Sequence, residues 1–415
     1  SEAESRFFDE SENRFLPSDS IFAESHLSQS ATDLHLGVIG FDIEHELNQA
    51  IKLSAGLKGT ASQAYNTSGI QRWVENRWLT DHRAASKAQM QELIGGIYVN
   101  SDLRLGERTN LTAGLRYEYW DRQSVEAAID RSFGRFFPSV FLTHKASDQT
   151  EWRLALNRRI SRPSFQDLAN NLTYNGPLSV FAGNPNLNPN LVTNLSLSFL
   201  YQSYQISLGV REEDNPIARY QISENSQGDL IYVLPHNLDY QQSINLSLQL
   251  PIELGSKLSL NLGGSGAWRR YRLSHTIEAF EGNYFTYNLN GNLRLQLPWE
   301  MSAELSGWYA GPFHEGSKVF EGFGMLNAGF QKQWKNSIVQ LSVSDLFQSM
   351  NIWSYFGELT PEAYQAQTGV LFRPESSFRR VIRISYQYNF GNRDLKGRKR
   401  SKEGASEERA RLAPN

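Results

Sequence analysis

The chain has 415 residues, of which 40% are hydrophobic, and a formal net charge of −3. This near balance gives no overall field that would indicate nucleic acid as a partner. No run of 18 apolar residues occurs, which excludes a helical membrane protein. A membrane β-barrel is compatible with this composition, because its strands distribute apolar residues in alternation.

Alternation of apolar and polar residues dominates the chain and predicts strands. It is clearest between residues 285 and 297, where Phe285, Leu289 and Leu293 fall on one face and Asn288 and Asn292 on the other. Most predicted strands have about ten to fourteen residues, long enough to cross a bilayer when tilted. In chain order they are 34–47, 51–65, 91–105, 110–121, 136–145, 151–160, 191–202, 204–216, 240–250, 257–270, 284–297, 301–311, 323–334, 338–347 and 379–390.

The connections between these strands alternate between short and long. Three-residue to six-residue turns are expected at positions such as 48–50 and 298–300, and longer loops at 66–90, 122–135, 161–190, 217–239, 271–283, 312–322 and 348–378. Short periplasmic turns and long external loops are typical of a transmembrane barrel. A soluble sandwich has no reason to sort its loops by length in this way.

This alternation also suggests a domain organisation. Residues 1–33 are expected to be an external loop or a residual strand region, residues 34–390 the barrel wall, and residues 391–415 a charged periplasmic tail. The predicted strands number fifteen, whereas closed bacterial barrels normally have an even number. We therefore expect either that upstream strands are missing or that a strand in 1–33 is overlooked.

Few residues form patterns that indicate chemistry. The eight histidines are scattered without zinc-site spacing, and no nucleotide-binding or hydrolase motif occurs. We expect no enzymatic activity, no metal and no cofactor. Arg158, Arg159 and Arg162 form the densest basic cluster in the barrel region, at the external end of a predicted strand. They either contact an anionic substrate in the lumen or pair with inward carboxylates of the wall or plug.

Several stretches resemble a known family in their order and spacing. They are Leu111–Glu118 (LTAGLRYE), Phe136–Ser139 (FFPS), Arg158–Leu168 (RRISRPSFQDL), Gly183–Pro189 (GNPNLNP), Val343–Phe347 (VSDLF) and Ser385–Gly391 (SYQYNFG). Together they span roughly residues 90–391. The chain thereby resembles the outer-membrane β-barrel family of TonB-dependent receptors of the Bacteroidetes type.

The resemblance implies an all-β, antiparallel, up-and-down transmembrane barrel of the plugged, 22-stranded class, of which this chain holds the C-terminal part with about 15 strands. It implies uptake of an unknown nutrient through the bacterial outer membrane. The expected partners are outer-membrane lipid, a missing N-terminal plug with further strands, and the TonB system through that plug, with no nucleic acid. A fragment of this kind is expected to misassemble alone.

Two other functions are compatible with the pattern of strands. One is a structural or adhesive outer-membrane barrel without transport, and the other is a secreted β-protein that binds glycans. Detergent dependence and heat-modifiable migration on gels distinguish a membrane barrel from a soluble protein.

Overall fold

We describe the fold from a computed structural model of the chain. The structure describes residues 2–15, 20–124, 129–169, 172–176, 179–224, 231–276, 278–356, 368–372, 380–388 and 390. The tail expected at 391–415 lies outside the described residues.

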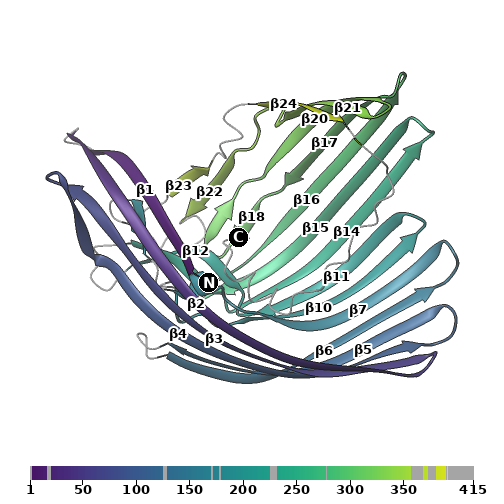
Figure 1. Ribbon diagram of the computed structural model, residues 1–415, viewed down its shortest axis with the longest axis horizontal. Coiled ribbons are helices and arrows are strands. Elements are labelled where there is room, and N and C mark those ends of the chain that lie inside the picture. The colour runs from purple at the N-terminus through teal and green to yellow at the C-terminus, as the bar shows by residue number, and fades with distance from the viewer. Residues whose placement is uncertain are drawn as a thin grey trace.

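Sixteen strands form one antiparallel sheet that curves strongly into a wall (Figure 1). Neighbours in the sheet follow one another along the chain, as in an up-and-down barrel. The strands at the two edges of the sheet, residues 2–15 and 381–388, are not hydrogen-bonded to each other within the described residues. The strands of the wall are β1 (Glu2–Phe15), β2 (Ser20–Asn48), β3 (Ile51–Val74), β4 (Arg77–Arg104), β5 (Thr109–Ser124), β6 (Ile129–Lys145), β7 (Thr150–Ser161), β10 (Asn190–Tyr201), β11 (Tyr204–Asp214), β14 (Tyr240–Leu254), β15 (Leu258–Leu273), β16 (Phe280–Leu297), β17 (Met301–Ala310), β20 (Phe323–Trp334), β21 (Ser337–Ser344) and β24 (Val381–Tyr388).

Every predicted strand corresponds to one strand of the wall, and β1 is additional. β1 pairs with β2 from Glu2 opposite Asp33 to Phe15 opposite Ser20. Region 1–33 is therefore largely strand, which matches the alternative of a strand overlooked there rather than an external loop, and the described wall has sixteen strands. The sequence of β1 places polar residues at most positions. It lacks the apolar alternation that reveals a strand, and its pairing depends on backbone hydrogen bonds to β2.

The loop predicted at 66–90 is also wrong, because β3 and β4 continue through it as one long hairpin. Glu75 and Asn76 form the two-residue turn, and both have positive φ, 49° and 62°. Two consecutive positive φ angles suit the twist of a tight hairpin. β2, β3 and β4 have 29, 24 and 28 residues, more than twice the length that a tilted strand needs to cross a bilayer. The outer halves of these strands therefore extend beyond the membrane.

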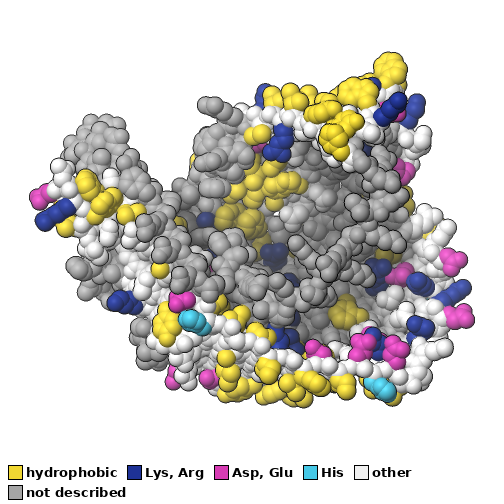
Figure 2. All heavy atoms as spheres, viewed as in Figure 1, with side chains coloured by type: hydrophobic (Ala, Val, Ile, Leu, Met, Phe, Trp, Pro, Cys, Tyr) yellow, Lys and Arg dark blue, Asp and Glu magenta, His cyan; other side chains and the backbone are white. Residues whose placement is uncertain are grey.

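The outer face of the wall is apolar. Along β2, the side chains of Ile39, Phe41, Ile43 and Leu47 are all more than half exposed, whereas inward Leu34 is 4% exposed. Hydrophobic side chains line the lower, outer border of the wall in Figure 2, and charged ones gather at the right, over the short-turn ends. An apolar belt of this kind faces lipid.

Aromatic side chains mark both borders of the belt. Near the short turns, the rings of Trp152 and Phe199 lie 4.7 Å apart and Trp299 is 77% exposed. Towards the other end, the outward side chains of Tyr119 and Tyr65 are 44% and 39% exposed. Aromatic residues prefer the two membrane–water interfaces, so their positions indicate where the bilayer begins and ends.

The long connections fold inward and pack against the wall. They contain α1 (Phe165–Leu168), β8 (Thr173–Gly176), β9 (Ser179–Phe181), β12 (Ile217–Glu224), β13 (Ile231–Asn237), β18 (Phe313–Glu315), β19 (Lys318–Phe320), β22 (Ile352–Phe356) and β23 (Thr368–Phe372). These short strands form two four-stranded sheets, β12-β13-β9-β8 and β18-β19-β22-β23.

The core of the molecule lies between these loops and the inner face of the wall. Inward Leu34, Ala64 and Met90 of β2–β4 form a buried cluster with Phe165 and Leu187 of the 161–190 connection. Among the described residues, no helix has the length and hydrophobicity to cross a membrane.

Candidate functional site

The inner face of the wall is polar near the short turns. Gln296 of β16, Ser302 of β17, Gln331 of β20 and Gln340 of β21 are successive neighbours in register. They line a cavity of about 630 Å³ on the inner face. The amide and hydroxyl groups supply hydrogen-bond donors and acceptors to whatever occupies this part of the lumen.

At the opposite end, the GNPNLNP segment ties two loops together. Asn184 donates from Nδ2 to the carbonyl oxygen of Pro235 at 2.9 Å, and its Oδ1 accepts from the Asn186 amide at 2.9 Å. The Asn188 amide donates to Asn237 Oδ1 at 2.7 Å. The Asn184–Asn186 bond closes an Asx turn. In addition, the Asn184 side chain and the Asn188 backbone bind the loop that contains β13.

Gly183 is required at the start of this segment because of a close backbone approach. A Cβ atom there would overlap the carbonyl oxygen of Ala169 and lie 2.9 Å from that of Gln166. The next residue, Asn184, donates its amide to the Asp167 carbonyl oxygen at 2.6 Å. The glycine thus lets the chain run directly against α1.

α1 begins with a reciprocal cap. Ser164 Oγ accepts from the Asp167 amide at 3.0 Å, and the Ser164 amide donates to Asp167 Oδ2 at 3.1 Å. The same carboxylate receives two hydrogen bonds from Arg219 of β12, from Nε at 3.0 Å and from Nη2 at 3.1 Å. Burial alone would raise the pKa of Asp167, but the bonds and charge of Arg219 and the bonds from Ser164 hold it below its usual value.

A third loop joins this arrangement through β12. Glu315 of β18 accepts the Arg219 amide at 3.1 Å on Oε1. Gln221, which is fully buried, donates from Nε2 to the Glu315 carbonyl oxygen at 2.8 Å and accepts from both the amide and the hydroxyl of Ser317 at 2.8 Å. The three connections 161–190, 215–239 and 311–322 therefore form one linked unit, which we call the loop cap.

The structure separates the three arginines selected from the sequence. Arg158 lies on the outer face with the exposed Leu156 and Leu195, 3.9 Å from Asp214, so the expectation that it faces the lumen is wrong. Arg159 shares the inner face with buried Val192. The difference arises because residues 158 and 159 are adjacent in β7 and must point to opposite faces.

Arg162 forms an ion pair with Glu118 of β5, and both side chains are 8% exposed. This outcome matches the alternative in which an arginine pairs with an inward carboxylate of the wall. Arg162 therefore fixes the loop cap to β5, and only Arg159 of the three remains a candidate for contact with a substrate.

Sequence reasoning missed Arg122 of β5, which has a comparable role. Its side chain is 1% exposed, and Nη2 donates to the carbonyl oxygens of Pro185 and Leu187 at 2.8 and 3.2 Å. The guanidinium also lies 5.3 Å from the ring of Trp120, a cation–π distance. The sequence placed Arg122 at the start of the loop predicted at 122–135, whereas β5 continues to Ser124. Its partners, 63 and 65 residues away, could not be predicted from the sequence.

Two histidines stack where β13 meets the β15–β16 connection. The rings of His236 and His275 are 4.5 Å apart and inclined by 10°. Burial lowers the pKa of both, that of His275 to about 3, where the neighbouring His236 contributes as well. The described residues contain no group of three or more side chains suited to hold a metal ion.

The apolar exterior, polar interior and inward-folded loops define the wall of an outer-membrane β-barrel. The family model for the outer membrane protein beta-barrel family matches residues 3–373, and the chain belongs to that family. This places it in the bacterial outer membrane. The Bacteroidetes type stays a prediction. No curated protein sequence matches the chain significantly.

Solved structures of similar fold are described as receptors and transporters, and their sequence identity to this chain is low. The copper transporter OprC has a TM-score of 0.58 at 13% identity, with 93% of this chain and 61% of that chain covered. The ferric-catecholate import receptor Fiu from Escherichia coli K12 has a TM-score of 0.58 at 10% identity, with 94% of this chain and 60% of that chain covered. The FrpB iron transporter from Neisseria meningitidis (F3-3 variant) has a TM-score of 0.54 at 14% identity, with 93% of this chain and 62% of that chain covered. The chain thus spans about three fifths of the length of these structures.

Proposed function

We propose that this chain forms the wall and external loop cap of a TonB-dependent receptor that takes up a nutrient across the outer membrane. The observation that carries the proposal is the loop cap itself. Three connections are joined over the interior by buried polar contacts centred on Arg219 and Gln221. A purely structural or adhesive barrel has no need of ordered loops folded into its lumen, whereas a receptor uses them to enclose its ligand.

The proposal assigns the polar inner cavity near the short turns to a plug domain. Gln296, Gln331 and Gln340 present amides towards the lumen at the periplasmic end, where a plug has to be held and released. Through that plug the TonB system would supply energy for uptake. We propose no catalytic reaction for the chain.

The substrate class is proposed from the similar folds. The solved structures are described as transporters or receptors for iron, ferric catecholate and copper. A metal chelate is therefore the first nutrient to test. Arg159, on the inner face below the loop cap, is the candidate contact for its anionic groups.

The experiment measures uptake in whole cells of the bacterium that carries the gene. Radiolabelled ferric catecholate and copper are supplied to wild type, to a deletion strain and to that strain complemented with the full-length gene or its Arg159→Gln variant. We expect uptake in wild type and in the complemented strain but not in the deletion strain, and we expect it to stop when the membrane potential is removed. The strain with Arg159→Gln should take up less than the strain with the unchanged gene. Arg153→Gln is the matched control, because this arginine is inward but pairs with Glu151 near the short turns.

Other outcomes would point elsewhere. Normal uptake and normal growth of the deletion strain under iron and copper limitation would contradict the metal-chelate class. Loss of surface attachment without any loss of uptake would favour an adhesive barrel.

A further inference from the structure

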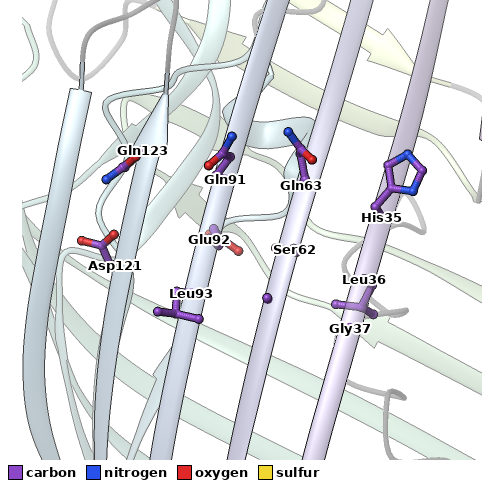
Figure 3. Close-up of a pocket in the computed structure, with 11 residues that line it drawn as sticks. His35, Leu36, Gly37, Ser62, Gln63, Gln91, Glu92, Leu93, Asp121 and Gln123 are labelled. Carbon is purple, nitrogen blue, oxygen red and sulfur yellow. The ribbon is translucent and has the colours of Figure 1, made fainter.

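A row of polar side chains crosses four strands on the outer face of the wall. His35 of β2, Gln63 of β3, Gln91 of β4 and Gln123 of β5 are direct neighbours in register. Figure 3 shows the four side chains one beside the next on consecutive strands. They share the outward face with the exposed Leu93, so they do not point into the lumen.

The row borders a hollow in the outer surface. The next row towards the belt is Gly37, Ala61, Leu93 and Asp121, and together these residues line a cavity of about 690 Å³. Gly37 has no side chain and Ala61 has only a methyl group, which leaves space at this part of the lining. The next row towards the belt contains Gly95, which has no side chain, and a Cβ atom added there would meet no atom within 4 Å.

A second cavity, of about 450 Å³, lies on the same strands within the apolar belt. Its lining is almost entirely hydrophobic and includes Phe41, Leu57, Ile97 and Phe136. Phe41 is six residues along β2 from His35, a distance of about 20 Å at 3.3 Å per residue. The strands therefore carry a polar hollow and an apolar hollow along one line, as a headgroup and an acyl chain would require.

The polar row lies at the level of the outer membrane surface. The exposed apolar positions of β2 run from Leu47 to Ile39. Gly37 is the next outward position of β2, between Ile39 and His35 of the polar row. From Leu47 to Gly37 is about 33 Å along the strand, which is about 25 Å across the membrane at a tilt of 40°. An apolar band of about 25 Å is the height expected for an outer-membrane barrel. Lipid headgroups of the outer leaflet therefore surround His35 and its neighbours.

We propose that these two hollows bind one outer-leaflet lipid with an uncharged sugar headgroup. The side-chain amides of Gln63, Gln91 and Gln123 offer both donors and acceptors, and the Asp121 carboxylate accepts from hydroxyl groups. The apolar hollow holds the acyl chain, and its continuity with the membrane belt identifies a lipid as the occupant. This site is independent of transport through the lumen.

The charges at the site favour sugar hydroxyls over a phosphate. None of the described residues that line the two cavities is a lysine or an arginine. The imidazole of His35 lies 3.4 Å from the Asp33 carboxylate, so His35 already has an acidic partner within the protein. An anionic headgroup would meet Asp121 and Asp33 without a lysine or arginine among the described residues of the lining, at a cost that low dielectric increases.

The test compares two lipids with identical acyl chains. The full-length protein is placed in phosphatidylcholine nanodiscs that contain equal minor amounts of diglucosyl diacylglycerol and phosphatidylglycerol, and native mass spectrometry counts the lipids it retains. We expect selective retention of the diglucosyl lipid. The Gln63→Ala/Gln91→Ala variant should retain about tenfold less, because it removes hydrogen bonds that each contribute a few-fold. Gln242→Ala, an outward amide on β14 away from both hollows, should retain as much as wild type.

A second variant keeps the proposal testable if the double variant folds poorly. Ala61→Leu fills the polar hollow, which Ala61 lines, without replacing any side chain of the polar row, and it should also abolish selective retention. Heat-modifiable migration on gels checks the fold of each variant. Retention that is equal in all variants, absence of selective retention by the wild type, or preference for phosphatidylglycerol would each overturn the proposal.

Discussion

Replacement of Arg219 by Met tests whether the loop cap depends on its buried ion pair. The guanidinium makes two hydrogen bonds to Asp167, whose side chain is 11% exposed. Breaking a buried pair by removing one partner costs about 3–5 kcal/mol. Arg219 is 39% exposed, and solvent screening lowers the expected cost to about 2 kcal/mol. This corresponds to opening of the loop cap about 30 times more often.

Hydrogen exchange measured by mass spectrometry on the protein in detergent reports that opening. In Arg219→Met, exchange should accelerate about 30-fold in peptides from 161–169 and 217–222, and not in β14 or β16. Arg270→Met is the matched control, because Arg270 pairs with Glu281 and both are well exposed. It should change exchange by less than about twofold. Equal effects of the two variants would refute the reasoning.

The pH dependence gives an independent check on the same pair. The pKa of Asp167 is lower in the folded cap than its unfolded value of about 3.9. Its stabilising contribution is therefore complete above about pH 4 and is lost as the pH falls through the folded pKa. In Arg219→Met, burial without the arginine raises the pKa of Asp167, so exchange of 161–169 should begin to accelerate at a higher pH than in wild type.

Three further predictions concern the membrane face, the histidine pair and the cap glycine. Leu293→Arg should destabilise the folded protein by about 2–4 kcal/mol in urea titrations in lipid, because Leu293 is on the lipid face. Asn292→Ala should destabilise it much less, and equal losses of stability would mean that the faces are wrongly assigned. The contact of His236 with His275 should weaken as pH falls from about 6.5 towards 3, since the folded pKa of His275 is about 3. His275→Phe should reduce that dependence in hydrogen exchange of 231–239 and leave the part that is due to His236. Gly183→Ala should open the loop cap to proteases at 161–190 while the wall stays heat-modifiable, and unchanged cleavage would contradict the close backbone approach.

The strands within the membrane were predictable because lipid imposes a rule on each residue separately. Outward positions must be apolar, so Leu289 and Leu293 alternate with Asn288 and Asn292 and the pattern is visible in the sequence. Outside the membrane this rule ends. β1 and the outer part of the β3–β4 hairpin are strands without a regular pattern. Sequence reasoning assigned the hairpin to a loop and left residues 1–33 open between a loop and a residual strand.

The candidate site was predictable only in part. The Arg158–Leu168 and Gly183–Pro189 segments were recognised, but their role in joining loops depends on partners such as Arg219, Asn237 and Glu118, which are distant in sequence. The sequence by itself determined the class of fold, the strand order and the two faces of the wall, because each follows from local alternation. Only the tertiary structure decided that Arg158 faces outward, that Arg162 is buried against β5 and that three loops form one cap. Those outcomes depend on which segments meet across the lumen, and local alternation does not encode such contacts.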